Sequence, residues 1–164
     1  MQKLTLFLLL ITYSLSSAQQ KTEINNILEQ WHKAAADANF DAYFGLMTKD
    51  AIFIGTDPTE NWTNADFKAF SKPYFDKGKA WGFSTLERNI FAENDMSIAW
   101  FDELLDTQMG ICRGSGVVQK TNQGWKIKHY VLSIAIPNEN VKEITELKKT
   151  FDTDLMKKLR VKSN

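Results

Sequence analysis

Two places in the chain carry side chains that could do acid–base chemistry. The first is the segment 55–62, where Asp57 follows a short apolar run and precedes a proline. Pro58 fixes its own φ and favours an extended conformation at Asp57, so the strand must end there. A carboxylate at a strand end is well placed to face a cavity and take up a proton. Asp57 is therefore a candidate general base; alternatively, it is a turn acid that accepts hydrogen bonds from the backbone near 59–61.

The second place is His129, within a predicted strand. Histidine changes its charge near neutral pH, so His129 is a candidate acid, base or hydrogen-bond donor to a ligand. The alternative is a half-buried histidine whose hydrogen bonds are satisfied internally. Because His32 and His129 are the only histidines, Cys112 is the only cysteine and the carboxylates are scattered, the sequence predicts no metal site and no cofactor.

The first eighteen residues resemble an export signal. Lys3 supplies a positive start, residues 4–13 are almost wholly apolar, and residues 16–18 are small. About ten apolar residues are too few to span a membrane, which needs about 20. We therefore expect cleavage after Ala18, a periplasmic or secreted protein, and no membrane association after cleavage.

The remaining chain suits a single domain over 19–140, followed by a C-terminal segment over 141–164. Lys and Arg total 20, as do Asp and Glu. Such a balance argues against a nucleic-acid partner or an anionic membrane surface. Cys112 cannot form an internal disulfide, which is compatible with export and does not demonstrate it.

Hydrophobic periodicity indicates helices first and strands later. Apolar residues from Ile24 to Ala38 recur at helical spacing, and Asn39 breaks the pattern. A short helix over about 41–47, a strand over 51–56, and a helix capped by Thr63 are expected next. Long strands are then predicted over about 82–92, 97–106, 111–121 and 124–136. The segment 141–164 is an amphipathic helix.

This order of elements favours an α+β domain with a curved antiparallel sheet wrapped around N-terminal helices. Short motifs along it resemble a SnoaL-like domain of the nuclear transport factor 2-like superfamily: Trp31-His32, residues 54–58 with Glu60 and Trp62, residues 99–103, residues 113–117, Gly124-Trp125, and residues 129–133. The resemblance covers about 22–140. It implies a cone-shaped fold, and it does not by itself imply an activity.

In the ketosteroid isomerase relatives, an acid followed by proline abstracts a proton next to a carbonyl, and Asp57 resembles that acid. That chemistry also requires donors for the developing oxyanion. The position expected to carry a tyrosine donor is Trp31 here, and the position of a protonated acid is near Ser115. These departures disfavour steroid isomerisation.

Strand pairing predicts which side chains meet. A three-residue loop over 122–124 would place Val117 opposite His129, Ser115 opposite Val131, and Arg113 opposite Ser133. Lys126 and Lys128 need solvent, so the face that carries these six residues is predicted to line the interior. Arg113 would then either bind a ligand or pair with Glu103 or Asp102.

Together these features predict a small-molecule binding module for an apolar or aromatic ligand. Trp31, Trp62 and Trp100 could form its walls, with the alternative that most tryptophans are ordinary core. Glu103, Arg113 and Ser133 complete the predicted binding set. The alternative function is a cofactor-free isomerase, dehydratase or cyclase with Asp57 or His129 as general base, and an interaction-only domain is a third.

Apolar residues Tyr130, Leu132, Ile134 and Ile136 are predicted to continue the outer face of the last strand. Either the C-terminal helix or a second subunit should cover such a face. Members of the superfamily often dimerise through the sheet, and we therefore expect a homodimer.

Overall fold

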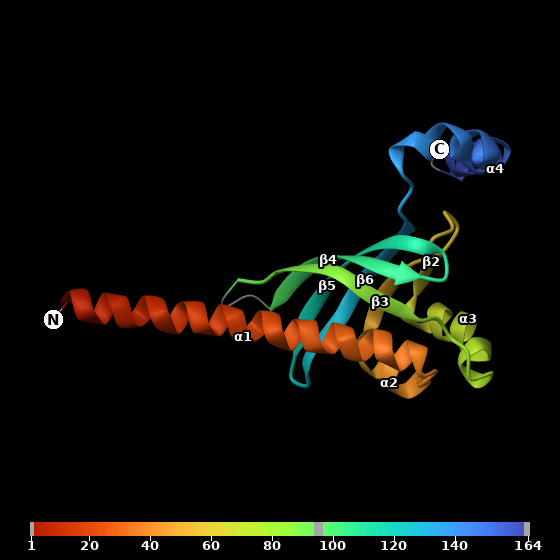
Figure 1. The fold of residues 1–164 in the computed structure, drawn as a ribbon. Coiled ribbons are helices and arrows are strands. Elements are labelled where there is room, and N and C mark those ends of the chain that lie inside the picture. Colours follow the sequence, from red (N-terminus) through yellow and green to blue (C-terminus); the bar gives the residue numbers. More distant parts are fainter. Residues whose placement is uncertain (1, 94–96, 163–164) are drawn as a thin grey trace. The chain divides into compact units, whose positions relative to one another are not determined.

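The structure, a computed structural model, describes residues 2–93 and 97–162, with side chains from residue 18 onward (Figure 1). The chain divides into two units, residues 1–134 and 135–164, and each is described by itself. Within the described residues, the first unit contains helices α1 to α3 and a six-stranded sheet. The predicted α+β class is thus confirmed.

Helix α1 spans Gln2–Ala36, and its part from Ile24 onward packs against the core. Ala38 has a positive φ of 51°, which ends the helix, and the Asn39 side chain caps α2 (Phe40–Gly45) by accepting a hydrogen bond from the N–H of Ala42 at 3.1 Å. The predicted break at Asn39 is therefore confirmed. The buried face of α1 consists of Ile24, Leu28, Trp31, His32, Ala34 and Ala35.

Strand β1 spans Met47–Ile54, and the short strand β2 spans Asn61–Thr63. Helix α3 follows at Asn64–Asp76 and continues through Pro73. Its predicted cap is confirmed, because Thr63 Oγ1 accepts a hydrogen bond from the N–H of Asp66 at 3.3 Å. Strand β2 was not predicted, since three residues are too few for a periodic signal.

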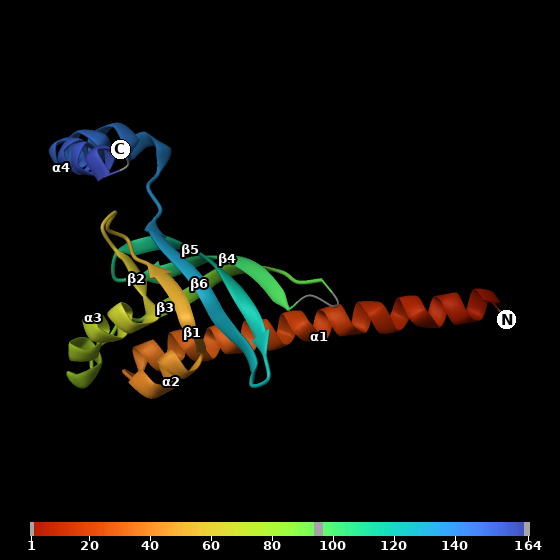
Figure 2. The ribbon, with the colours of Figure 1, turned by 180° about the vertical axis from the view of Figure 1, so that it is seen from behind.

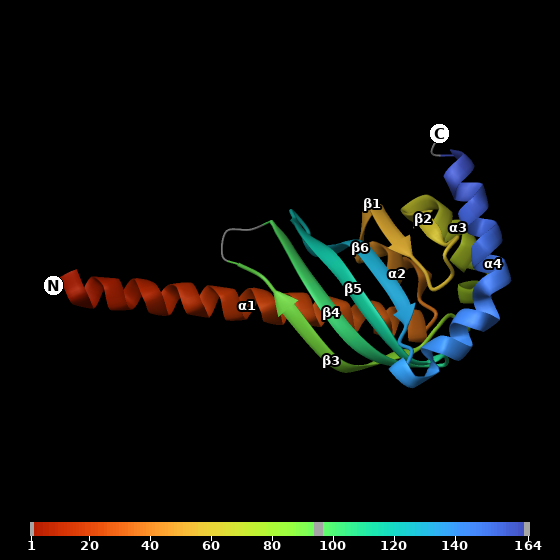
Figure 3. The ribbon, with the colours of Figure 1, turned by 90° about the horizontal axis from the view of Figure 1, so that it is seen from above.

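Four long strands complete the sheet, in the order β2-β1-β6-β5-β4-β3. They are β3 (Phe83–Phe91), β4 (Ile98–Thr107), β5 (Gly110–Thr121) and β6 (Gly124–Ile134). Neighbouring strands are antiparallel except β1 and β6, which are parallel. Helices α1 to α3 lie on one side of this sheet, and its strands cross α1 obliquely (Figures 2 and 3).

The β5–β6 hairpin has a shorter loop than predicted. Thr121 pairs with Gly124, so the loop has two residues. A bulge next to Val117 then restores the predicted partners: Val117 lies opposite His129, Ser115 opposite Val131, and Arg113 opposite Ser133. The predicted pairs are confirmed, although the predicted loop is wrong.

This bulge reverses the faces that the sequence predicts. Ile127 and Tyr130 are both fully buried, and the two residues between them, Lys128 and His129, are only partly buried. A bulge places one extra residue on a strand, so the alternation of faces shifts by one beyond it. The prediction that Arg113 and His129 line the interior is therefore wrong. The prediction that Tyr130 and Leu132 face outward is wrong for the same reason.

The second unit contains a short 3-10 turn, Asn138–Asn140, and helix α4, Val141–Lys162. The predicted C-terminal helix is present, and none of its described residues is buried. Its apolar stripe includes Leu147, Phe151 and Leu159, with exposed fractions of 75, 48 and 52%. Among the described helices, none has the length and hydropathy needed to cross a membrane.

Candidate functional site

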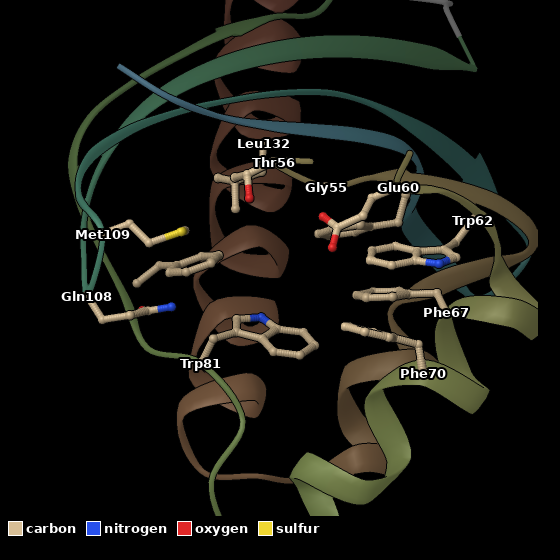
Figure 4. Close-up of a pocket in the computed structure, with 12 residues that line it drawn as sticks. Gly55, Thr56, Glu60, Trp62, Phe67, Phe70, Trp81, Gln108, Met109 and Leu132 are labelled. Carbon is tan, nitrogen blue, oxygen red and sulfur yellow. The ribbon is translucent and has the colours of Figure 1, made fainter. Parts of the chain in front are cut away.

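A pocket of about 190 Å³ opens on the helix-covered side of the sheet in the first unit (Figure 4). Its walls come from β1, the β1–β2 turn, β2, α3, the segment before β3, the start of β3, the β4–β5 turn and β6. The lining is mainly apolar and aromatic. It consists of Phe53, Gly55, Thr56, Glu60, Trp62, Phe67, Phe70, Trp81, Phe83, Gln108, Met109 and Leu132.

Stacked aromatic rings form one wall of the pocket. The ring of Trp62 stacks on Phe70 with a centroid distance of 4.5 Å and on Phe67 with 5.5 Å. Phe67 also stacks on Phe53 at 4.0 Å and on Trp81 at 5.7 Å. Phe67 and Phe70 are three residues apart, so α3 presents both rings on the same side. Such rings offer a flat apolar surface of fixed shape.

Glu60 supplies the charge of the pocket. The N–H of Gly55 donates to the backbone oxygen of Glu60 at 3.0 Å, which closes the β1–β2 turn. The N–H of Asp57 donates to Glu60 Oε2 at 3.2 Å, and the carboxylate is directed into the cavity (Figure 4). A Cβ at Gly55 would lie 2.1 Å from Oε2. The carboxylate therefore occupies space that only glycine leaves free.

Asp57 belongs to the same turn but does not line the pocket. It is exposed, and its Oδ1 accepts hydrogen bonds from the Thr59 hydroxyl at 2.5 Å and the Thr59 N–H at 2.8 Å. These two hydrogen bonds lower the pKa of Asp57 below its ordinary value. The arrangement is that of a turn acid, the alternative that the sequence left open.

A separate polar cluster is buried between α1 and the sheet. The Glu103 carboxylate accepts hydrogen bonds from His32 Nε2 at 2.9 Å, the Tyr130 hydroxyl at 2.8 Å and Arg88 Nε at 2.8 Å. The Arg88 guanidinium also donates to Asn25 at 2.9 Å and to Glu29 at 2.6 Å. His32, Glu103 and Tyr130 are buried, Asn25 is partly buried, and the Glu29 side chain is 54% exposed at the edge of the cluster. None of the residues named lines the aromatic pocket.

The electrostatics of this cluster favour an ionised Glu103. Burial alone would raise the pKa of Glu103, but the hydrogen bond and charge of His32, the charge of Arg88 and the hydrogen bond from Tyr130 outweigh it, so the pKa is lowered. Burial, followed by the neighbouring Glu103 charge, raises the pKa of Tyr130 well above its ordinary value. Because the carboxylate is fully buried and fully paired, it holds α1 to β3, β4 and β6.

The predicted partner of Arg113 is wrong. Arg113 lies opposite Leu104 in the β4–β5 ladder, and Gly114 lies opposite Glu103. Arg113 and Ser133 are exposed on the outer face of the sheet, and His129 is partly buried there. Glu103 therefore faces inward, and its cation partner is Arg88 on β3.

The predicted tryptophans have three different surroundings. Trp62 lines the pocket. Trp31 is buried in the core, stacked on Tyr43 with a centroid distance of 4.9 Å. Trp100 is 47% exposed on the outer face and stacks on Phe91 at 5.8 Å. Of the eight predicted site residues, all within the described part of the chain, Trp62 alone lines this pocket.

Sequence reasoning did not assign a role to Glu60 or to the rings of α3. The sequence contains a feature that could have indicated each role. Glu60 lies in the same short turn segment as Asp57, and Phe67 and Phe70 recur at helical spacing directly after a capping threonine. The proximity of Trp81 and Met109 to these residues arises only from the tertiary fold. Among the described residues, no three His, Cys, Asp or Glu side chains gather into a group that could hold a metal ion.

Comparisons with known proteins agree with the fold. Similar solved structures include an NTF2-like protein of unknown function from Pseudomonas putida, with 13% identity, a TM-score of 0.62, and coverage of 76% of this chain and 93% of that chain. A candidate dehydratase of the NTF2-like family from Streptomyces avermitilis has 9% identity, a TM-score of 0.61, and coverage of 71% and 96%. The association domain of C. elegans CaMKII has 18% identity, a TM-score of 0.59, and coverage of 73% and 98%.

At these identities the solved structures show the fold alone. No curated protein matches the sequence. The SnoaL-like domain family, in contrast, matches residues 24–137, which is more than half of the chain. The chain is therefore a member of the SnoaL-like domain family, and its first unit has the fold of NTF2-like proteins.

Proposed function

We propose that this protein is an exported SnoaL-like domain that binds a small apolar or aromatic ligand in the pocket between the β1–β2 turn, α3 and Trp81. The observation that carries the proposal is the stacked aromatic wall with a single carboxylate beside it. Ligand sites are typically concave and mainly apolar, with a few polar groups that orient the ligand. A cavity of about 190 Å³ suits a small ligand, because the pockets that bind drug-sized ligands measure about 300–1,000 Å³.

The test compares two tryptophans that the sequence assigns to the same role. Indole binding is measured by ligand-observed NMR for the wild type, Trp62→Ala and Trp100→Ala. We expect Trp62→Ala to weaken binding by at least about tenfold, because a stacking surface is lost, and Trp100→Ala to leave it unchanged. Equal loss in both variants, or an affinity in Trp62→Ala equal to that of the wild type, would move the ligand away from this pocket.

Export is part of the proposal and rests on the apolar run at residues 4–13. Among the residues whose side chains the structure describes, the buried core begins at Ile24, so cleavage after Ala18 would remove none of those core residues. Mass spectrometry of the protein expressed with its complete N-terminus, together with cell fractionation, tests this step. A mature mass that begins at Gln19 in the periplasm or medium supports export, and an intact chain retained in the cytoplasm contradicts it.

A cofactor-free isomerase, dehydratase or cyclase is the second candidate, favoured by the position of Glu60 in the pocket. One structural neighbour is a candidate dehydratase. Asp57 and His129 support this candidate poorly, because neither lines the pocket. Proton transfer to a bound substrate would depend on Glu60 instead. Asp57→Asn and His129→Ala should accordingly leave ligand affinity unchanged.

Homodimerisation through the outer face of the sheet is also proposed. Phe91 and Trp100 stack on each other there, and both are more than 40% exposed, as is Ile98. Exposed apolar groups that gather on one face are typical of protein–protein contacts. One structural neighbour is an association domain. The residues that support the dimer therefore differ from the Tyr130 and Leu132 pair that the sequence suggested.

A further inference from the structure

The pocket carries a single negative charge. Among the described residues that line it, Glu60 alone is charged. None of the ion pairs formed within residues 2–93 and 97–162 includes Glu60, and its carboxylate accepts one hydrogen bond, from the N–H of Asp57. Glu60 is only partly buried, so water can solvate its carboxylate when the pocket is empty. A positively charged ligand that enters the pocket would still meet a carboxylate with no ion-pair partner among the described residues.

The aromatic wall of the pocket also favours a positively charged ligand. Ring faces carry negative electrostatic potential and attract a cation within about 6 Å of the centroid, tryptophan most strongly. Lys68 and Lys72 of α3 lie over the rings of Phe44 and Phe40, which do not line the pocket, at 5.4 Å each. These lysines therefore do not cover the pocket rings. Phe67 is 1% exposed and stacks on Phe53 and Trp81, so the rings that keep surface for a ligand are Trp62, Phe70 and Trp81.

An anionic ligand would find no cationic side chain among the described lining residues of the pocket. Arg113, expected from the sequence to orient a ligand, lies on the outer face of the sheet. Arg88 donates to Glu103, Asn25, Glu29 and Thr85 and is committed to the buried cluster. No lysine or arginine is among the described lining residues, so an anion would face only the Glu60 carboxylate.

We propose that the pocket selects a small organic cation, an alkylated ammonium whose apolar groups contact the ring faces and whose charge is balanced by Glu60. This inference rests on the proposed binding function and adds the charge of the ligand. Gly55 contributes by leaving room for the carboxylate, since a side chain there would displace Oε2 from the cavity. Aromatic rings and a carboxylate both attract positive charge. The pocket should therefore discriminate between ligands of similar shape by their charge.

The experiment uses three probes of nearly identical shape. Choline is positive, 3,3-dimethylbutan-1-ol is its neutral isostere, and 3,3-dimethylbutanoate is negative. Binding to the protein is measured by NMR titration for the wild type, Glu60→Gln and Asp57→Asn. Asp57→Asn is the matched control, because it removes the same charge from the same turn without altering the pocket lining.

We expect the wild type to bind choline at least about tenfold more tightly than the neutral isostere and to bind the anion most weakly. Glu60→Gln should abolish most of this preference with little change for the neutral probe, and Asp57→Asn should keep it. Saturable binding of the neutral probe without a preference for choline, or a preference that survives in Glu60→Gln, would overturn the cation inference and leave the proposed binding function standing. If none of the three probes binds while indole does, the cation inference fails and the binding function stands; if indole does not bind either, both fail.

Discussion

At the scale of residues, the position of the Glu60 carboxylate depends on a neighbour that has no side chain. Gly55 has an ordinary φ, so its role is to provide space rather than conformational freedom. The nearest atom that a new Cβ would meet, at 2.1 Å, is Oε2 at the far end of the flexible Glu60 side chain, and the Cβ of Glu60 would follow at 3.1 Å. A substitution at Gly55 should therefore change the pocket more than the stability of the fold.

Gly55→Ala should weaken choline binding nearly as much as Glu60→Gln, because the carboxylate must leave its place. The free energy of unfolding should change by less than about 1 kcal/mol, since the displaced end can rotate towards solvent. Gly82→Ala is the control, because a Cβ there meets nothing within 4 Å. Chemical denaturation and the choline titration check both parts. Unchanged choline affinity in Gly55→Ala would show that the carboxylate position does not determine binding.

Glu103 carries the other residue-scale prediction. Glu103→Gln removes the charge that pairs with Arg88 and His32 in the interior, and loss of one partner of a buried ion pair costs about 3–5 kcal/mol. Asp102→Asn, on the next residue of the same strand, should cost less than about 1 kcal/mol, because Asp102 faces outward and bonds to Asn89. Urea unfolding of both variants tests the difference. Equal losses would contradict the assigned faces of β4.

The lowered pKa of Glu103 also predicts a pH dependence. The unfolded carboxyl titrates near its ordinary value of 4.5, and the folded one titrates below it. The stabilisation is therefore complete above pH 4.5 and is lost as the pH falls through the folded pKa. Stability of the wild type should decline below pH 4.5, and Glu103→Gln should flatten that decline. A variant that loses stability with acid as steeply as the wild type would refute this origin.

At the scale of elements, the sequence predicts where strands lie better than which way they face. Helix α1, the cap of α3 and the four long strands follow periodic or capping signals, and the structure shows them close to the expected residues. The partners of β5 and β6 were also predicted correctly. The bulge beside Val117 has no composition signal, and a single extra residue there reverses the faces of Tyr130 and His129.

This one reversal explains three of the seven predicted residues that do not line the pocket. His129, Arg113 and Ser133 were assigned to the interior by strict alternation from Trp125, and all three lie on the outer face. The residues that do line the pocket come from eight elements and connecting segments, and contacts such as Trp81 with Phe67 depend on tertiary packing. The role of Trp62 in the pocket lining was predicted correctly because Trp62 belongs to the segment 55–62 that follows β1.

Two neighbouring substitutions on β6 test the faces. Tyr130→Phe should cost about 1–3 kcal/mol, because it removes the hydroxyl that donates to the buried Glu103 carboxylate at 2.8 Å. His129→Ala should change stability by no more than about 0.5 kcal/mol, because the side chain is only partly buried on the outer face. Thermal unfolding of both variants is sufficient. A larger loss for His129→Ala would restore the alternation predicted from the sequence.

At the scale of the whole molecule, two surfaces remain apolar and exposed. One is the outer face of the sheet around Trp100, and the other is the stripe on α4 that includes Leu147 and Phe151. A homodimer could use either surface. Multi-angle light scattering of the wild type at micromolar concentration should show a dimer if the proposal is correct.

Trp100→Asp should convert that dimer to monomer, because an aspartate placed opposite its symmetry-related copy must be desolvated without a partner. Leu147→Asp should leave the dimer intact if the sheet forms the interface. Dissociation by Leu147→Asp and not by Trp100→Asp would assign the interface to α4. A wild-type monomer would remove the dimer altogether.

The binding pocket can be located directly with the five tryptophans of the chain as reporters. In a protein labelled at the indole nitrogens, addition of unlabelled indole should shift the signals of Trp62 and Trp81, which line the pocket. The signal of Trp100 on the outer face should not move. Saturable shifts of Trp62 and Trp81 with one common dissociation constant are the predicted result. Shifts at Trp100 without shifts at the pocket pair, or no saturable shift at any tryptophan, would contradict the aromatic pocket as the ligand site.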